Sequence, residues 1–166
     1  MQLLIVGSAQ CVWNDIRGID IKECDVMAIN DMIMHFPKID HAYSNSKELL
    51  PHWVKCRRTG LNKDFKTHSR MDSKGGYADY EHDLPGGGSS ALNAVILGLK
   101  LGYDKIVLAG IPLDNSPHYF DPPWEKSNFK NEIPDKDNGL KYWNSYLDQM
   151  KGKVFSMSGR TKQLLG

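Results

Sequence analysis

The sequence predicts an α/β domain of the Rossmann-like, doubly wound class, with a mostly parallel sheet and helices on both faces. Short apolar segments alternate with helical ones along the chain, as in repeated βαβ units. The segments 2–6 and 105–110 are apolar in the manner of strands buried on both faces. Between them lies an apolar helix, 91–101, followed by Gly102 at the usual position of a C-terminal cap.

The remaining elements follow from local pattern, in chain order. Strands are expected at 25–30, 40–44 and 154–157. Helical segments are expected at 12–16, 46–58, 140–150 and 161–165. Residues 59–85 are polar and aperiodic, so we expect a loop, and residues 111–139 hold five prolines and predict a lid or insertion loop. The whole chain, 1–166, is expected to form a single domain.

Composition excludes several classes of protein. Of the 166 residues, 40% are hydrophobic, which is enough for a core and excludes global disorder. Lys and Arg total 21 against 20 Asp and Glu, so binding of nucleic acid through bulk charge is not expected. No stretch reaches the roughly 18 apolar residues of a membrane span. Three cysteines without CxxC spacing favour reduced thiols and a cytoplasmic location, and a homo-oligomer is compatible with the sequence.

Polar residues follow several of the predicted strands. Ligands of doubly wound sheets bind beyond the carboxyl ends of the strands, which here brings together 7–10, 30–31, 44–45 and 110–114. Gly7 and Ser8 stand where such folds contact a nucleotide, although a tight turn explains them too. Asn30 and Asp31 suit a ribose or base edge, or a cap of the next turn. Asp114 belongs to the same edge.

A glycine-rich turn, 86–90, precedes the helix at 91–101. Gly87 and Gly88 allow close approach of an anion, and the hydroxyls of Ser89 and Ser90 suit a phosphate or carboxylate. The simpler interpretation is a flexible loop that ends in a serine N-cap. We favour the anion site because the turn should lie near the ligand edge of the sheet.

The predicted lid contains His118 and Tyr119, which suit a general base and a phosphate donor, respectively. A loop histidine beside packed aromatics is an equally good interpretation. The other five histidines lack the spacing of metal ligands, and neither HExxH nor an acidic pair for a divalent metal appears. We therefore expect chemistry without a metal ion or other cofactor.

Several segments together resemble the bacterial sialyltransferases of the family that includes Campylobacter lipooligosaccharide enzymes. They are 3–10, 25–30, the Gly-Ser turn with its helix, 103–110 and His118-Tyr119. The turn at 7–10 departs from that family, because it lacks the second glycine and the Pro-Ser pair. The whole chain also looks like small uncharacterised proteins of bacteriophages and prophages.

The resemblance implies a domain that binds a nucleotide or nucleotide-sugar, such as a cytidine monophosphate sugar. Gly7 and Ser8, Asn30, and Ser89 and Ser90 would hold the nucleotide, with His118 as base and Tyr119 as phosphate donor. Two functions follow as hypotheses. The first is a metal-independent, glycosyltransferase-like enzyme of phage origin. The second is a non-catalytic phage protein that sequesters a host signalling nucleotide.

Overall fold

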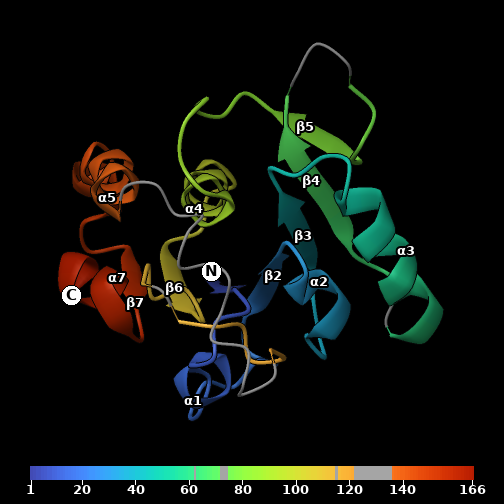
Figure 1. Ribbon diagram of the computed structural model, residues 1–166, viewed down its shortest axis with the longest axis horizontal. Helices are drawn as coiled ribbons and strands as arrows, with labels where there is room; N and C mark the ends of the chain where they lie inside the picture. Colours follow the sequence, from blue (N-terminus) through green and yellow to red (C-terminus); the bar gives the residue numbers. More distant parts are fainter. Residues whose placement is uncertain (62, 72–74, 115, 122–135) are drawn as a thin grey trace.

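A seven-stranded sheet, parallel throughout, organises the chain in the computed structural model (Figure 1). The structure describes residues 1–61, 63–71, 75–114, 116–121 and 136–166, with only the backbone of 136–138. The strands are β1 (Gln2–Val6), β2 (Asp25–Ile29), β3 (His41–Ser44), β4 (Lys66–Arg70), β5 (Tyr80–His82), β6 (Lys105–Ala109) and β7 (Val154–Ser156). The predicted Rossmann-like class is confirmed.

Seven helices accompany the sheet in the described part of the chain. They are α1 (Val12–Asp15), α2 (Met32–His35), α3 (Leu50–Gly60), α4 (Ser90–Lys100), α5 (Lys136–Asn144), α6 (Leu147–Met150) and α7 (Gly159–Leu165). Since α5 begins at Lys136, the end of the segment predicted as a lid is helical.

Two apolar cores cover the two faces of the sheet, as the alternation of strand residues requires. Leu3 and Ile5 of β1 point into one core with α4, Trp143 of α5 and the end of α7. Leu4 and Val6 point into the other, formed with α1, α2 and α3. Figure 1 shows α4 and α5 on one side of the sheet and α1, α2 and α3 on the other. The prediction of helices on both faces is therefore confirmed.

The strand order is β5-β4-β3-β2-β1-β6-β7, so the chain winds outward from β1 in both directions. The reversal lies between β1 and β6, which pair from Gln2↔Lys105 to Val6↔Ala109. In doubly wound sheets the crevice beyond the carboxyl ends at this point is the usual ligand site. The topology thus singles out the turns after β1 and β6.

The predicted loop at 59–85 was wrong in part, because it contains β4 and β5. The buried residues of β4 are Thr67, His68 and Ser69, so the strand lacks the apolar pattern on which the prediction depended. The helix expected at 46–58 begins at Leu50, so Ser46, where that prediction began, lies before the helix and does not cap it. Pro51 lies in the first turn of the helix, a position that accepts proline. Helix α2 was not predicted, and the helix expected at 140–150 is divided into α5 and α6.

Within the described residues, no helix is both long and apolar enough to cross a membrane.

Candidate functional site

A small pocket of about 180 Å³ opens at the carboxyl ends of β1, β2 and β6. Its walls come from the turns after these three strands and from the segment 116–118. Five of the predicted site residues line it: Gly7, Ser8, Asn30, Asp114 and His118. The remaining lining residues are Ala9, Ile29, Gly110, Ile111, Pro112 and Ser116. The pocket therefore lies where the strand order reverses.

Two glycines bring the turns after β1 and β6 into backbone contact. A Cβ on Gly7 would lie 2.6 Å from the carbonyl oxygen of Gly110. Gly110 has a φ of +66°, and a Cβ there would overlap the carbonyl oxygen of Gly7 and Val12. The amide of Gly110 donates to the buried carboxylate of Asp15 at 2.9 Å. Each of these two positions therefore accepts only glycine. The close packing of the two turns explains Gly7 in the way that the alternative of a tight turn predicts.

Asn30 ends β2 in a left-handed conformation, with a φ of 54°. Asparagine tolerates this region better than other non-glycine residues. Its Oδ1 accepts a hydrogen bond of 2.8 Å from Ser44 Oγ at the end of β3. A non-glycine residue held in this conformation at a pocket wall is a feature that clusters at functional sites. Asp31, the next residue, precedes α2 and is not among the residues that line the pocket.

The described part of the predicted lid is attached to the turn after β1. Ala9 and His118 form an antiparallel bridge. The amide of Tyr119 donates to the carbonyl of Ser8, and the amide of Gln10 donates to the carbonyl of Pro117, each at 2.9 Å. These bonds hold His118 at the pocket wall. Residues 115 and 122–135 of the predicted lid lie outside the described residues.

His118 has a carboxylate beside it. Asp121 Oδ2 accepts from the backbone amide of His118 at 2.8 Å and lies 3.7 Å from its Nδ1. Asp121 is the better shielded of the two, with 18% of its side chain exposed against 31% for His118. A carboxylate at this distance stabilises an imidazolium, as a general base requires when it takes a proton.

Tyr119 lies outside the pocket lining, in an aromatic cluster. Its ring meets those of Trp13 and His35 edge-on, at centroid distances of 5.2 and 5.9 Å. Burial, and then the charge of Asp31, raise the pKa of Tyr119. The phenol therefore keeps its proton and remains a hydrogen-bond donor, but its ring is used for packing.

The glycine-rich turn lies against the end of β3 and does not line the pocket. Ser89 is the N-cap of α4, accepting from the amide of Leu92 at 3.3 Å. Ser90 Oγ accepts from the amide of Asn45 at 3.1 Å, and Asn45 Nδ2 donates to the carbonyl of Gly88 at 3.4 Å. The ring of Tyr142 covers Gly87, where a Cβ would lie 2.7 Å from Cζ. Both serines thus already have structural partners.

Two asparagines join the turn to the sheet, and neither was assigned a role from the sequence. Asn45 Oδ1 accepts from Tyr43 Oη at 2.7 Å and from Asn93 Nδ2 at 3.1 Å. Asn93 is 1% exposed, and its Oδ1 has no hydrogen-bond partner in the described structure. The signal for Asn93 was available, because it is the single amide side chain in an otherwise apolar helix. Asn45 follows a predicted strand at the ligand edge.

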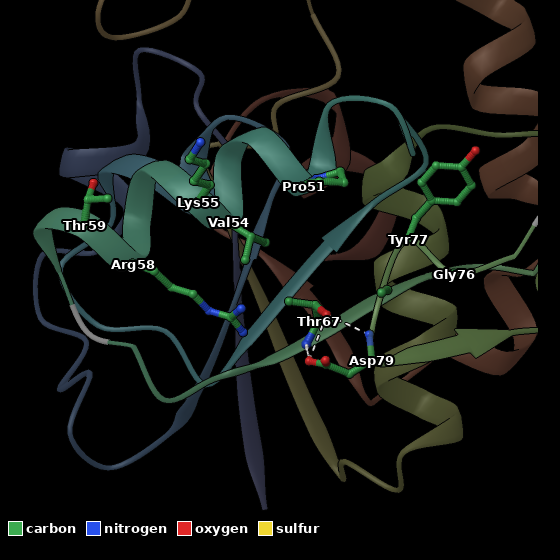
Figure 2. Close-up of a pocket in the computed structure, with 10 residues that line it drawn as sticks. Pro51, Val54, Lys55, Arg58, Thr59, Thr67, Gly76, Tyr77 and Asp79 are labelled. Atoms are coloured by element: carbon green, nitrogen blue, oxygen red, sulfur yellow. Dashed lines mark hydrogen bonds between the residues drawn. The ribbon is translucent and has the colours of Figure 1, made fainter.

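A second cavity of about 530 Å³ lies between α3, β4 and residues 76–79 (Figure 2). Arg58 reaches from α3 toward Thr67 and Asp79, whereas Lys55 points away from them. Asp79 Oδ2 accepts from the amide and the hydroxyl of Thr67, at 3.0 and 2.9 Å. The polar groups of Thr67 and Asp79 are thus paired with one another. The cavity shares no lining residue with the pocket at the strand ends. We therefore take the smaller pocket as the candidate site.

Among the residues that the structure describes, no group of three or more His, Cys, Asp or Glu side chains is arranged to hold a metal ion. The absence of a metal or cofactor from the chemistry stays a prediction.

Comparison with solved structures identifies the class of fold: over its length the chain is similar in fold to bacterial sialyltransferases. The sialyltransferase CST-II in complex with a trisaccharide acceptor and CMP has a TM-score of 0.63 and 14% identity, covering 100% of this chain and 85% of that one. CstII from Campylobacter jejuni with CMP has a TM-score of 0.61 and 13% identity, covering 99% and 84%.

The monofunctional alpha-2,3-sialyltransferase Cst-I from Campylobacter jejuni is also similar, with a TM-score of 0.62 and 12% identity, covering 96% of this chain and 76% of that one. No protein-family model matches the chain, and no curated protein sequence does. At these identities the likeness concerns the fold, so the resemblance stated from the sequence is confirmed for the fold.

Proposed function

We propose that the chain binds a nucleotide-sugar at the carboxyl ends of β1, β2 and β6 and transfers its sugar without a metal ion. The observation that carries this proposal is His118, held at the wall of the pocket with Asp121 beside it. It is supported by the similarity of the fold to sialyltransferases solved with CMP. Gly7, Ser8 and Asn30 would contact the nucleotide, with Asp114 at the same wall.

In the proposed reaction, His118 is the general base. An acceptor hydroxyl attacks the anomeric carbon of the sugar while the bond from that carbon to the phosphate oxygen breaks. The hydroxyl proton passes to His118, through Nε2 because Nδ1 lies on the side of Asp121. The electron pair of the broken bond leaves with the nucleoside monophosphate. Asp121 stabilises the imidazolium that forms.

The leaving phosphate needs donors that do not titrate near neutral pH. The raised pKa of Tyr119 keeps its phenol protonated, which suits the predicted donor role. Ser89 and Ser90 retain hydroxyl protons although their oxygens accept from backbone amides. Because none of the three lines the pocket, the ligand would have to extend toward Asn45 to reach Ser89 and Ser90, and toward Trp13 to reach Tyr119.

The test is incubation of the purified protein with a pool of nucleotides and nucleotide-sugars, followed by mass spectrometry of the solution and of the protein-bound fraction. Release of nucleotide over many turnovers supports transfer or its hydrolytic side reaction. The variant His118→Ala should lose about 10²–10⁴-fold in turnover while still binding nucleotide. His52→Ala, on the exposed face of α3, is the matched control. Equal loss of binding and turnover in His118→Ala would refute its role as base.

The size of the pocket favours a second candidate function. About 180 Å³ is below the roughly 300–1,000 Å³ that is typical of ligand sites. A compact site of this kind suits a phage protein that sequesters a nucleotide without turnover. Stoichiometric retention of an unchanged nucleotide in the same assay would support it, and catalytic product release would exclude it.

A further inference from the structure

Three histidines from three neighbouring strands form an unbroken chain of hydrogen bonds beneath α4. His41 Nδ1 lies 2.9 Å from His68 Nε2, and His68 Nδ1 lies 3.0 Å from His82 Nε2. At the other end His41 Nε2 lies 3.0 Å from Tyr103 Oη, which donates to Asp25 Oδ2 at 2.6 Å. The chain thus crosses from β2 to the edge strand β5. It takes no part in the proposed reaction.

The chemistry of these groups fixes the direction of every bond. The single phenolic proton of Tyr103 goes to Asp25, so the oxygen of Tyr103 accepts from His41 Nε2–H. A neutral His41 then has a bare Nδ1, which accepts from His68 Nε2–H. By the same reasoning His68 Nδ1 accepts from His82 Nε2–H. All three imidazoles therefore carry the proton on Nε2, and His41 and His68 must be neutral, because a proton on the Nδ1 of either would face the N–H of the next histidine.

The surroundings keep the imidazoles neutral. His41 and His68 are 8% and 2% exposed, and burial lowers the pKa of both, that of His68 to about 3. The charges that face the chain are Asp25 and Asp40 near His41, Lys66 near His41 and His68, Asp79 near His68, and Lys100 near His82. Burial, and then Lys100, lower the pKa of His82, the half-buried member. The two imidazoles that the bonds require to be neutral are therefore the two that are buried.

The outer end of the chain holds the least supported strand. β5 has three residues at the edge of the sheet, and it pairs with β4 at His68↔Tyr80, Ser69↔Glu81 and Arg70↔His82. The ring of Tyr80 stacks on that of His68, with centroids 5.4 Å apart. The glycine-rich turn begins four residues after His82 and contains the N-cap of α4. The position of this turn therefore depends on how firmly β5 is held.

We propose that His41, His68 and His82 form a proton-sensitive clamp, which holds β5 and the glycine-rich turn while His41 and His68 are neutral and is released when β5 opens and His68 takes up a proton. Opening of β5 breaks the bond from His82 Nε2–H to His68 Nδ1, and the freed Nδ1 then takes up a proton from solvent. β5 cannot close over this proton, because His68 Nδ1–H would face His82 Nε2–H, so low pH favours the open form. The effect of release on ligand affinity rests on the proposed function; the clamp itself does not.

The first test is nuclear magnetic resonance of the imidazole nitrogens at pH 7.5. Nε2–H tautomers are expected for His41, His68 and His82, with His41 and His68 still neutral at pH 5.5. His35 and His52, which are exposed, serve as internal references. An Nδ1–H tautomer at His68, or titration of His41 and His68 together with the exposed pair, would overturn the proposal.

The second test is amide hydrogen exchange of residues 80–90 between pH 7.5 and 5.5, corrected for the intrinsic exchange rate. The opening equilibrium should rise about tenfold for each histidine that gains a proton on opening, for an open-state pKa near 6.5. His68→Gln keeps an acceptor for His82 and a donor for His41 but cannot take up a proton, so its increase should be about tenfold smaller than that of the wild type. His52→Gln should respond as the wild type does. An unchanged response in His68→Gln, or none in the wild type, contradicts the clamp.

The third measurement separates the clamp from the proposed function. Titration with CMP by calorimetry should show weaker binding at pH 5.5 than at 7.5, with a smaller change in His68→Gln. If CMP binds at neither pH while the exchange result holds, the nucleotide site is refuted and the clamp stands. If CMP binds with the same change of affinity in both proteins, release of the turn does not reach the site.

Discussion

The centre of the sheet and the strands β3 and β4 on its flank are both largely buried, but they are stabilised in different ways. At the centre, Leu3, Leu4, Ile5 and Val6 of β1 are fully buried among apolar neighbours. On the flank, the buried residues of β4 are hydroxyl and imidazole side chains, and most of their polar atoms are paired through hydrogen bonds. The centre therefore depends on shape, whereas the flank depends on protonation.

The difference assigns separate tasks to the two regions. Apolar packing changes little with pH, so the pocket between β1 and β6 stands on a part of the molecule that is insensitive to protons. The flank carries the strand that precedes the glycine-rich turn, in a region whose hydrogen bonds require neutral histidines. The following predictions test this contrast, from the largest effect to the smallest.

The largest loss of stability is expected at the centre of the sheet, for the substitution Gly110→Ala. The added Cβ overlaps the carbonyl of Gly7 at a positive φ, so we expect a loss of about 3–5 kcal/mol in the free energy of unfolding, measured with urea. Gly18→Ala is the matched control, because Gly18 has a φ of +84° with nothing within 4 Å of the added Cβ. That variant should lose only about 1–2 kcal/mol. Equal losses would show that backbone conformation, rather than the contact, matters at Gly110.

On the flank, Tyr103→Phe removes one oxygen that bonds to both buried His41 and half-buried Asp25. Asp25 loses a donor and His41 Nε2–H loses its acceptor, so we expect a loss of about 1–3 kcal/mol in the free energy of unfolding. Tyr80→Phe is the control, because its ring keeps the stack on His68. A loss below about 0.5 kcal/mol for Tyr103→Phe would contradict the importance of this hydrogen bond for the flank.

The dependence on pH sharpens the contrast in the wild-type protein. His68 has a pKa of about 3 in the folded state and about 6.5 when unfolded, so below pH 6.5 the unfolded chain binds more protons. The free energy of unfolding therefore decreases as the pH is lowered. His68 alone should reduce it by about 1.4 kcal/mol between pH 7.5 and pH 5.5. Urea denaturation of the wild type and His68→Gln at both pH values measures this, with His52→Gln as the control. A loss toward pH 5.5 that is as large in His68→Gln as in the wild type would contradict the prediction.

The smallest effect is expected at the start of α4, where Ser89→Ala removes the N-cap. The amide of Leu92 loses its acceptor, and a loss of about 1 kcal/mol is expected in the free energy of unfolding. Ser89→Asp is the control, since it keeps an acceptor at the cap. If Ser89→Ala weakens nucleotide binding far more than stability, the hydroxyl contacts the ligand as the sequence predicts.

The central strands could be predicted from the sequence, whereas the strands on the β3–β5 flank were harder to predict. The strands at the centre, 2–6, 25–29 and 105–109, were predicted almost to the residue, because burial on both faces leaves an apolar run. β4 and β5 were missed because hydrogen bonds across three strands satisfy their polar side chains, and such long-range partners leave no local pattern. The edge rule brought together Gly7, Asn30, Asp114 and His118 at the pocket without knowledge of their distances.

Other site features depended on contacts that no local pattern contains. That Tyr119 packs between Trp13 and His35 follows from the meeting of α1, α2 and the segment 116–121. That Ser90 serves Asn45 follows from the placement of β3 beside the turn. The phage origin, and the roles of the site residues, stay predictions.

The pairing of β1 with β6 has a consequence for the folding of the chain during its synthesis on the ribosome. β1 is synthesised first, and β2 to β5 add to one side of it in order, but its other neighbour is β6. About 100 residues separate the two strands, so at the usual rate of translation β1 waits roughly 5–20 s for that partner. Throughout this interval the nascent chain carries an open and largely apolar strand edge, the feature that chaperones shield and that leads to aggregation.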